Sequence, residues 1–102
     1  MARQEHKEYD DSMYKAILSL KDVDECRRFF EDLCAMTEIS SLKQRFEVAK
    51  LLHHDEVYNQ IKEKTNASSA TISRVNRMLN YGTGCMAEIL DRIEAVDKET
   101  DQ

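Results

Sequence analysis

Small polar and basic side chains gather on one side of a predicted helix in the segment ASSATISRVNRMLN, residues 67–80. At about 100° per residue, that side of the helix carries Ser69, Ala70, Ser73, Arg74 and Arg77. Hydroxyl groups donate and accept hydrogen bonds, and guanidinium groups bind anionic oxygens, often through two parallel bonds. The segment therefore presents a surface suited to an anionic partner that offers hydrogen-bonding groups.

The opposite side of the same segment is apolar. Ile72, Val75 and Leu79 stand at i, i+3 and i+7 and form one stripe of a helix. This amphipathic pattern predicts that the apolar stripe packs against a core and leaves the polar side exposed.

A second short helix is predicted just before this one, from about Val57 to Lys64, and the break between the two is TNAS. Asn66 stands where a tight turn needs a positive φ, which Asn tolerates better than most residues. Ser68 is a predicted N-cap for the second helix, and Gly82 lies where that helix should end. Helix, tight turn and helix over residues 57–81 are the parts of a helix-turn-helix.

The major groove of B-DNA, about 12 Å wide, explains the small side chains, because bulky residues at the start of a recognition helix would hold its backbone away from the base edges. Ser and Thr hydroxyls can bond bases or phosphates, and arginines reach guanine or phosphate. We therefore expect residues 68–77 to enter the groove. On this pattern alone, an ordinary amphipathic helix in a bundle remains the alternative.

The rest of the chain also predicts helices. Ser12 can begin a first helix, Asp22 and Glu25 form a capping-box start for a second, and a last helix should run from Cys85 to about Val96. A third helix has Thr37, Ser40 or Ser41 as candidate N-caps and a buried stripe of Leu42, Phe46, Ala49 and Leu52. We expect a mobile arm over residues 1–11, one all-α domain over residues 12–96 and a frayed end over residues 97–102.

Composition supports an all-α fold, because the 102 residues include no Pro and only two Gly. The broad apolar stripes exceed what a small monomer comfortably covers, which indicates a homodimer. The net charge is -5, yet Tyr58 to Tyr81 holds four basic residues and one acidic residue, +3, so the remainder carries -8. No apolar run could span a membrane and no signal peptide is evident, so a cytoplasmic protein without a membrane partner is expected.

The sequence gives little support to an enzyme. There is no glycine-rich phosphate loop, nucleophile motif or metal-ligand spacing, and the three cysteines match no zinc or redox motif. His53 and His54 are adjacent, so their side chains point about 100° apart on a helix and do not chelate one ion together. We interpret them as cations at a helix end and expect neither a metal nor catalytic residues.

The segments QRFEVAKLL, residues 44–52, and ASSATISRVNRMLNYG, residues 67–82, resemble the Trp repressor superfamily. With the upstream sequence included, from about Ala16, the chain is most similar to the small Trp-repressor-like YerC/YecD group. The resemblance implies an intertwined all-α homodimer, in which the N-terminal helices and the last helix interlock with those of a second copy.

The resemblance also implies a function, a transcriptional regulator that binds double-stranded DNA and acts as a repressor on a pseudo-palindromic operator. The base-facing and phosphate-facing positions of the family fall on Asn59, Lys62, Ser69, Ala70 and Ser73. We expect Lys62, Arg74 and Arg77 to neutralise phosphates. The alternative is a helical protein-interaction module that keeps the helix-turn-helix as a scaffold and binds through its acidic surface.

An effector pocket is the last implication of the resemblance. Two arginines hold tryptophan in the repressor, and Arg45 and Arg74 occupy both positions here. Val75 and Met78 replace smaller residues of the repressor and add bulk to this pocket. Tryptophan is therefore not the expected co-repressor; either another small molecule serves as effector or none does.

Overall fold

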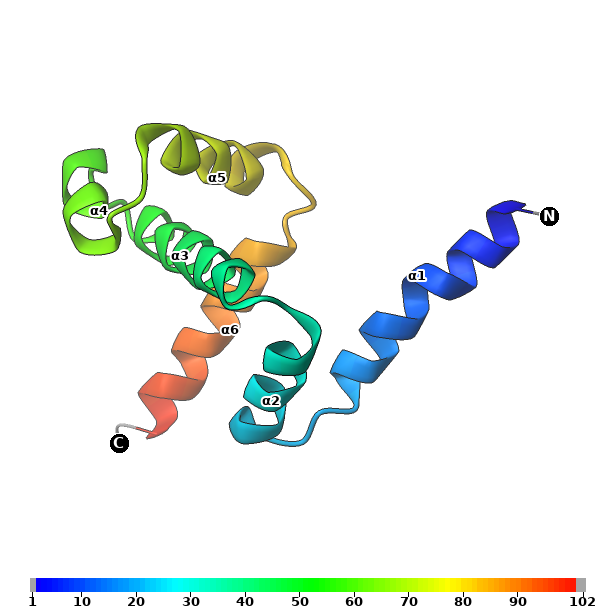
Figure 1. Ribbon diagram of the computed structural model, residues 1–102. Coiled ribbons are helices and arrows are strands. Elements are labelled where there is room, and N and C mark those ends of the chain that lie inside the picture. Colours follow the sequence, from blue (N-terminus) through cyan, green and yellow to red (C-terminus); the bar gives the residue numbers. More distant parts are fainter. Residues whose placement is uncertain (1, 101–102) are drawn as a thin grey trace. The chain divides into compact units, whose positions relative to one another are not determined.

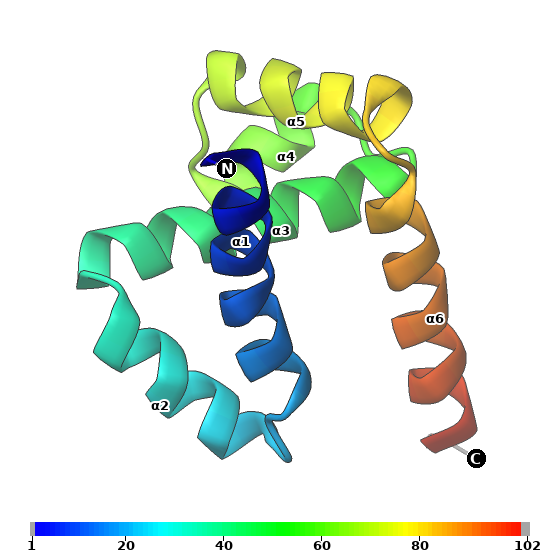
Figure 2. The same cartoon turned by 90° about the vertical axis from the view of Figure 1, so that its right-hand side faces the viewer.

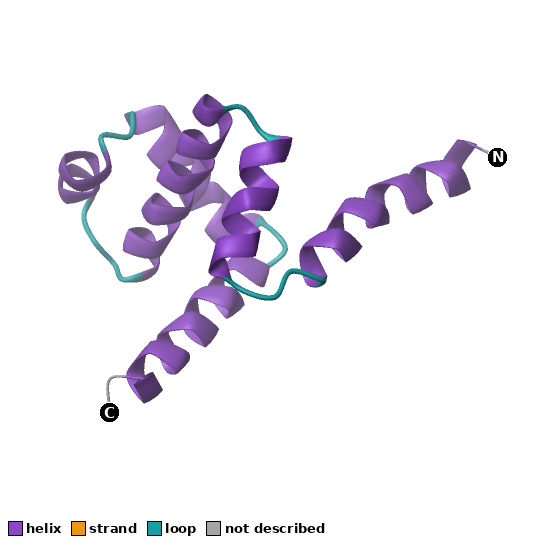
Figure 3. Ribbon diagram, turned by 60° about the horizontal axis from the view of Figure 1, so that its bottom comes forward, coloured by secondary structure: helices purple, strands orange, loops and turns teal. Residues whose placement is uncertain are grey.

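The computed structural model describes the backbone of residues 2–100 and the side chains of residues 10–98. Over these residues the chain forms helices joined by short turns, without any strand (Figure 3). The helices are α1 (Ala2–Leu18), α2 (Val23–Leu33), α3 (Met36–His53), α4 (Tyr58–Thr65), α5 (Ser69–Tyr81) and α6 (Cys85–Thr100). The prediction of an all-α fold is confirmed.

The chain divides into two units, the first ending at Ile39 and the second beginning at Ser40. In the second unit, α4 and α5 lie on the same side of α3 (Figures 1 and 2). Its core draws on all four helices and on the turn before α5, through Val48, Ala49, Ile61, Ala67, Ile72, Val75 and Leu90. Burial of each large aliphatic side chain contributes roughly 1.5–3 kcal/mol, so this core holds the helix-turn-helix on α3.

The first unit has no core of its own among the side chains that the structure describes, residues 10–39. Several large apolar side chains in it face outward, with exposed fractions of 85% for Leu18, 73% for Val23 and 71% for Met36. Its local structure still follows the sequence, because Asp22 Oδ1 accepts the Glu25 amide at 2.8 Å, as the predicted cap requires. In this unit the N-terminus of α2 is capped, whereas several of its described apolar side chains lack cover.

The two ends of the chain are more helical than the sequence predicted. The first helix begins at Ala2, so the predicted start at Ser12 is wrong, and the last helix continues past Val96 to Thr100. Residues 2–11 are rich in Arg, Gln, Glu and Lys, which have high helix propensity. The mobility predicted for residues 1–11 and the single domain over residues 12–96 stay predictions, and residues 101–102 lie outside the described part.

The start of the third helix also differs from the prediction. None of Thr37, Ser40 and Ser41 caps α3, because all of them lie inside the helix. Instead the Glu38 carboxylate accepts the amide of Ala35 at 2.7 Å. This is the reciprocal half of a capping box, and it lets a helix begin at a residue without a polar side chain.

The buried stripe predicted on α3 is only partly correct. Val48 and Ala49 are buried and Leu52 packs against the core, but the exposed fractions of Leu42 and Phe46 are 46% and 36%. The core forms on the side of α3 that meets α4 and α5. Leu42 and Phe46 are therefore left at the surface of this single chain.

The adjacent histidines at the end of α3 bind two different carboxylates of α6. His53 Nε2 lies 2.7 Å from Asp91 Oδ1, and His54 Nε2 contacts Glu94 Oε1. These contacts link the end of α3 to α6. The histidines were predicted to act as cations at the helix end, and the structure gives them this second role.

No helix in the described part of the chain is long and apolar enough to cross a membrane.

The helix-turn-helix follows its sequence signals closely. Asn66 has φ 60° and ψ 19°, which confirms the predicted left-handed turn, and its amide donates to the Lys62 carbonyl at 2.8 Å. Ser68 Oγ accepts the Thr71 amide at 3.1 Å, which confirms the predicted N-cap of α5. Gly82 ends α5, though its φ of -83° is not left-handed.

We expect the substitution Ser68→Ala to lower the free energy of unfolding by about 1 kcal/mol, because it removes the cap of α5. Ser69→Ala is the matched control, since Ser69 is exposed and makes no capping bond; it should change stability by less than about 0.5 kcal/mol. Urea denaturation followed by circular dichroism measures both. Equal stability losses in the two variants would contradict the assigned cap.

Candidate nucleic-acid interface

The side chains that the sequence singled out for contact with DNA are all at the surface of the helix-turn-helix. They come from α4, from the N-cap of α5 and from its first three turns, and they are Asn59, Lys62, Ser68, Ser69, Ala70, Ser73, Arg74 and Arg77. The opposite side of α5 is fixed, because Ile72 and Val75 are buried in the core. The packing of α5 therefore determines which of its sides faces outward.

Three of the basic side chains in this region lack an acidic partner among the residues that the structure describes: Lys62, Arg74 and Arg77. Lys64 differs, because its Nζ contacts Oε1 of Glu56, and the Glu56 side chain has an exposed fraction of 30%. A cation already paired with a carboxylate offers less charge to another anion. The charge available to a partner is therefore on Lys62, Arg74 and Arg77.

Ser68 has the capping role predicted for it, and its predicted contact with DNA stays a prediction. Its hydroxyl accepts the Thr71 amide and donates to Thr71 Oγ1 at 3.0 Å, so both of its bonding functions serve the cap. Ser69 and Ala70, the first two residues of α5, come next. Backbone amides at these positions have no partner within a helix, so they can donate to an anion along with the Ser69 hydroxyl.

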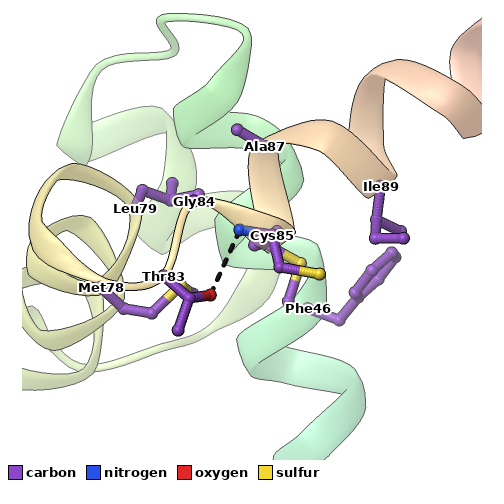
Figure 4. A pocket seen from close by; sticks show the side chains of 9 residues that line it. Phe46, Met78, Leu79, Thr83, Gly84, Cys85, Ala87 and Ile89 are labelled. Atoms are coloured by element: carbon purple, nitrogen blue, oxygen red, sulfur yellow. Dashed lines mark hydrogen bonds between the residues drawn. The ribbon is translucent and has the colours of Figure 1, made fainter.

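The four residues predicted for an effector pocket lie in different settings. Arg45 and Arg74 are exposed, and Val75 is a core residue with an exposed fraction of 3%. Met78 alone among them borders an open cavity of about 240 Å³ between α3, α5 and α6 (Figure 4). The lining of this cavity is Phe46, Met78, Leu79, Thr83, Gly84, Cys85, Met86, Ala87 and Ile89.

This cavity is mainly apolar. Its hydroxyl, that of Thr83, accepts the amide of Cys85 at 3.2 Å and so caps the start of α6 (Figure 4). Phe46 and Met78 at its border each have an exposed fraction of 36%. Such a lining suits apolar side chains better than a charged effector.

One residue outside the helix-turn-helix, which the sequence pattern did not indicate, bonds to its turn. Gln44 of α3 donates a hydrogen bond from Nε2 to the carbonyl oxygen of Thr65 at 3.1 Å. Thr65 ends α4 and precedes the left-handed Asn66. No local pattern could have found this bond, because it joins residues that are 21 positions apart.

Known proteins share this architecture. Residues 8–94 match the family described as Trp repressor protein. The uncharacterized protein YerC of Bacillus subtilis (strain 168) is 50% identical over 90 residues, which cover 88% of this chain and 86% of YerC.

Solved structures agree with the sequence comparison. A TrpR-like protein from Eubacterium eligens ATCC 27750 superposes with a TM-score of 0.80 at 55% identity, covering 82% of this chain and 87% of that chain. A structure from Staphylococcus aureus gives a TM-score of 0.80 at 45% identity, covering 82% and 84%. The chain belongs to the Trp repressor family.

Proposed function

We propose that this protein is a sequence-specific DNA-binding transcriptional regulator, a cytoplasmic repressor that acts as a homodimer on a pseudo-palindromic operator. The observation that carries the proposal is the outward side of α5, where exposed Ser69, Ala70 and Ser73 precede Arg74 and Arg77, which have no acidic partner among the described residues. Family membership supports it, since the family is one of regulatory proteins rather than enzymes.

The arrangement of side chains on α5 suits the major groove. The small residues lie in the first turns, where a recognition helix approaches the base edges, and the arginines lie further along. Ser69 and Ser73 can bond base edges, and the Ala70 methyl can contact a thymine methyl. Lys62, Arg74 and Arg77 supply the contacts to phosphates, which give affinity without sequence preference.

The acidic remainder of the chain limits how the protein approaches DNA. With -8 outside the segment from Tyr58 to Tyr81, other faces of the protein repel the phosphate backbone at low salt. At physiological ionic strength this repulsion decays over about 8 Å. Binding is therefore restricted to the helix-turn-helix face.

A homodimer accounts for the uncovered apolar surface. The first unit buries none of its described side chains, and the second unit leaves Phe46 and Met78 half-exposed beside an apolar cavity. Exposed apolar side chains that gather on a surface are typical of protein interfaces. A two-fold axis would also place two α5 helices about one helical turn of DNA apart.

The proposal does not require tryptophan. Val75 is buried in the core, and Met78 borders an apolar cavity rather than a site for a charged amino acid. Regulation by a different small molecule is compatible with the same DNA interface.

A selection of bound duplexes from a random pool at about 0.15 M salt tests the proposal, because non-specific electrostatic binding is already weak there. We expect enrichment of a site with two-fold symmetry, with and without added tryptophan. If no sequence is enriched in either condition, the DNA-binding proposal fails, and the acidic surface becomes the argument for a protein-interaction module.

The two classes of side chain on α5 should behave differently. Arg77→Ala should weaken binding to every duplex and reduce the slope of log affinity against log salt by about one, because one phosphate contact is lost. Ser73→Ala should change the preferred bases and leave the salt slope unaltered. Arg92→Ala, an exposed basic residue of α6, is the control. Fluorescence anisotropy titrations over a salt series measure these effects, and a uniform loss from both variants would refute the division of roles.

The substitution Met36→Glu should dissociate the homodimer. It replaces an apolar side chain, 71% exposed in the single chain, with a charged one that the proposed interface would have to bury. Sedimentation velocity should give twice the chain mass of 11.9 kDa for the unmodified protein and the single-chain mass for the variant. Thr37→Glu places the same charge on the neighbouring exposed polar residue and should leave the dimer intact. An unmodified protein that sediments at the single-chain mass would exclude the homodimer.

A further inference from the structure

The turn of the helix-turn-helix depends on a hydrogen bond from outside the motif. The last carbonyl groups of a helix have no partner within it, and the Thr65 carbonyl is one of these at the end of α4. Gln44 Nε2 donates to this oxygen at 3.1 Å in a partly buried setting. A partly buried carbonyl without a donor is unfavourable. The side-chain amide of Gln44 provides the hydrogen-bond donor that the turn itself lacks for the Thr65 carbonyl.

The other side-chain and backbone bonds of this turn are local. Thr65 Oγ1 donates to the Ile61 carbonyl at 2.7 Å and accepts the Ala67 amide at 3.2 Å. These bonds fix the shape of the turn but not its direction relative to α3. Among the hydrogen bonds of the described residues, the one from Gln44 joins α3 to the turn.

Apolar packing also holds the turn on α3, through the buried Ile61 and Ala67. Such packing is largely non-directional, whereas a hydrogen bond needs its donor and acceptor aligned. The Gln44 bond therefore restricts rotation of the turn on the core. Because α5 begins at Ser69, four residues after Thr65, any rotation of the turn moves the first turn of α5.

We propose that Gln44 is a positioning residue for DNA recognition: its bond to the Thr65 carbonyl sets the angle at which α5 presents Ser69, Ala70 and Ser73. This inference rests on the proposed DNA-binding function. Sequence preference depends on Gln44, whereas the phosphate contacts of Lys62, Arg74 and Arg77 tolerate small changes of angle, since they act mainly through charge.

The substitution Gln44→Met isolates the donor, because Met has a similar length and helix propensity but no amide. We expect affinity for the selected operator to fall about tenfold, toward the non-specific level. Affinity for an unrelated duplex and its salt slope should stay unchanged. In nitrogen-15 correlation spectra of the free protein, the amides of Asn66 and Ala67 should shift and exchange faster with solvent.

The control is Gln60→Met, which makes the same replacement at an exposed glutamine of α4. It should leave the ratio of specific to non-specific affinity as in the unmodified protein. Gln44→Glu adds a second test, because a carboxylate opposite the Thr65 carbonyl cannot donate at neutral pH. It should lose specificity as Gln44→Met does.

Two results would overturn the inference while the proposed function stands. One is an unchanged affinity ratio in Gln44→Met. The other is an equal loss on operator and unrelated duplex together with a lower melting temperature, which would assign Gln44 a structural role only. If the unmodified protein selects no operator at all, the proposed function fails and this inference fails with it.

Discussion

The left-handed backbone at Asn66 is the constraint on which the arrangement of α4 and α5 depends. One residue at φ 60° ends α4, because its amide donates to the Lys62 carbonyl. It also redirects the chain so that Ala67 is buried and Ser68 can cap α5. Most L-amino acids pay a steric cost of roughly 1–2 kcal/mol in this conformation, and Asn reduces it through local hydrogen bonding. The nearest glycine in the sequence is Gly82, so Asn meets the requirement where no Gly is present.

The parts of the fold that could be read from the sequence are those fixed by neighbouring residues. Asp22, Asn66 and Ser68 each act within a few residues of their own position, and each has the role that its type indicated. The predicted start of α3 was wrong for a related reason. Three hydroxyl residues looked like caps, whereas the side chain that caps the helix is Glu38, which reaches back to Ala35. Several residues competed for one function there, and propensity alone could not choose between them.

The candidate site also has features that the sequence predicted and features that it did not. Helical periodicity predicted which side of α5 is exposed, because the buried Ile72 and Val75 fix the opposite side. It could not predict that Glu56 pairs with Lys64 or that Gln44 reaches Thr65. Nor could it place Met78 beside Phe46, which is distant in sequence and belongs to another helix. These contacts depend on how α3, α4, α5 and α6 pack, and no single helix carries that information.

The first unit of the chain has a thermodynamic consequence. Among its described side chains, residues 10–39, none is buried, so the helices α1 and α2 gain little from the hydrophobic effect within one chain. Whatever covers their apolar faces binds the folded state in preference to the unfolded one. Stability then follows mass action, rising with the logarithm of the concentration of the covering partner. For the proposed homodimer, the amount of this protein in a cell would therefore set how much of it is folded, as well as how much of the proposed operator it can occupy.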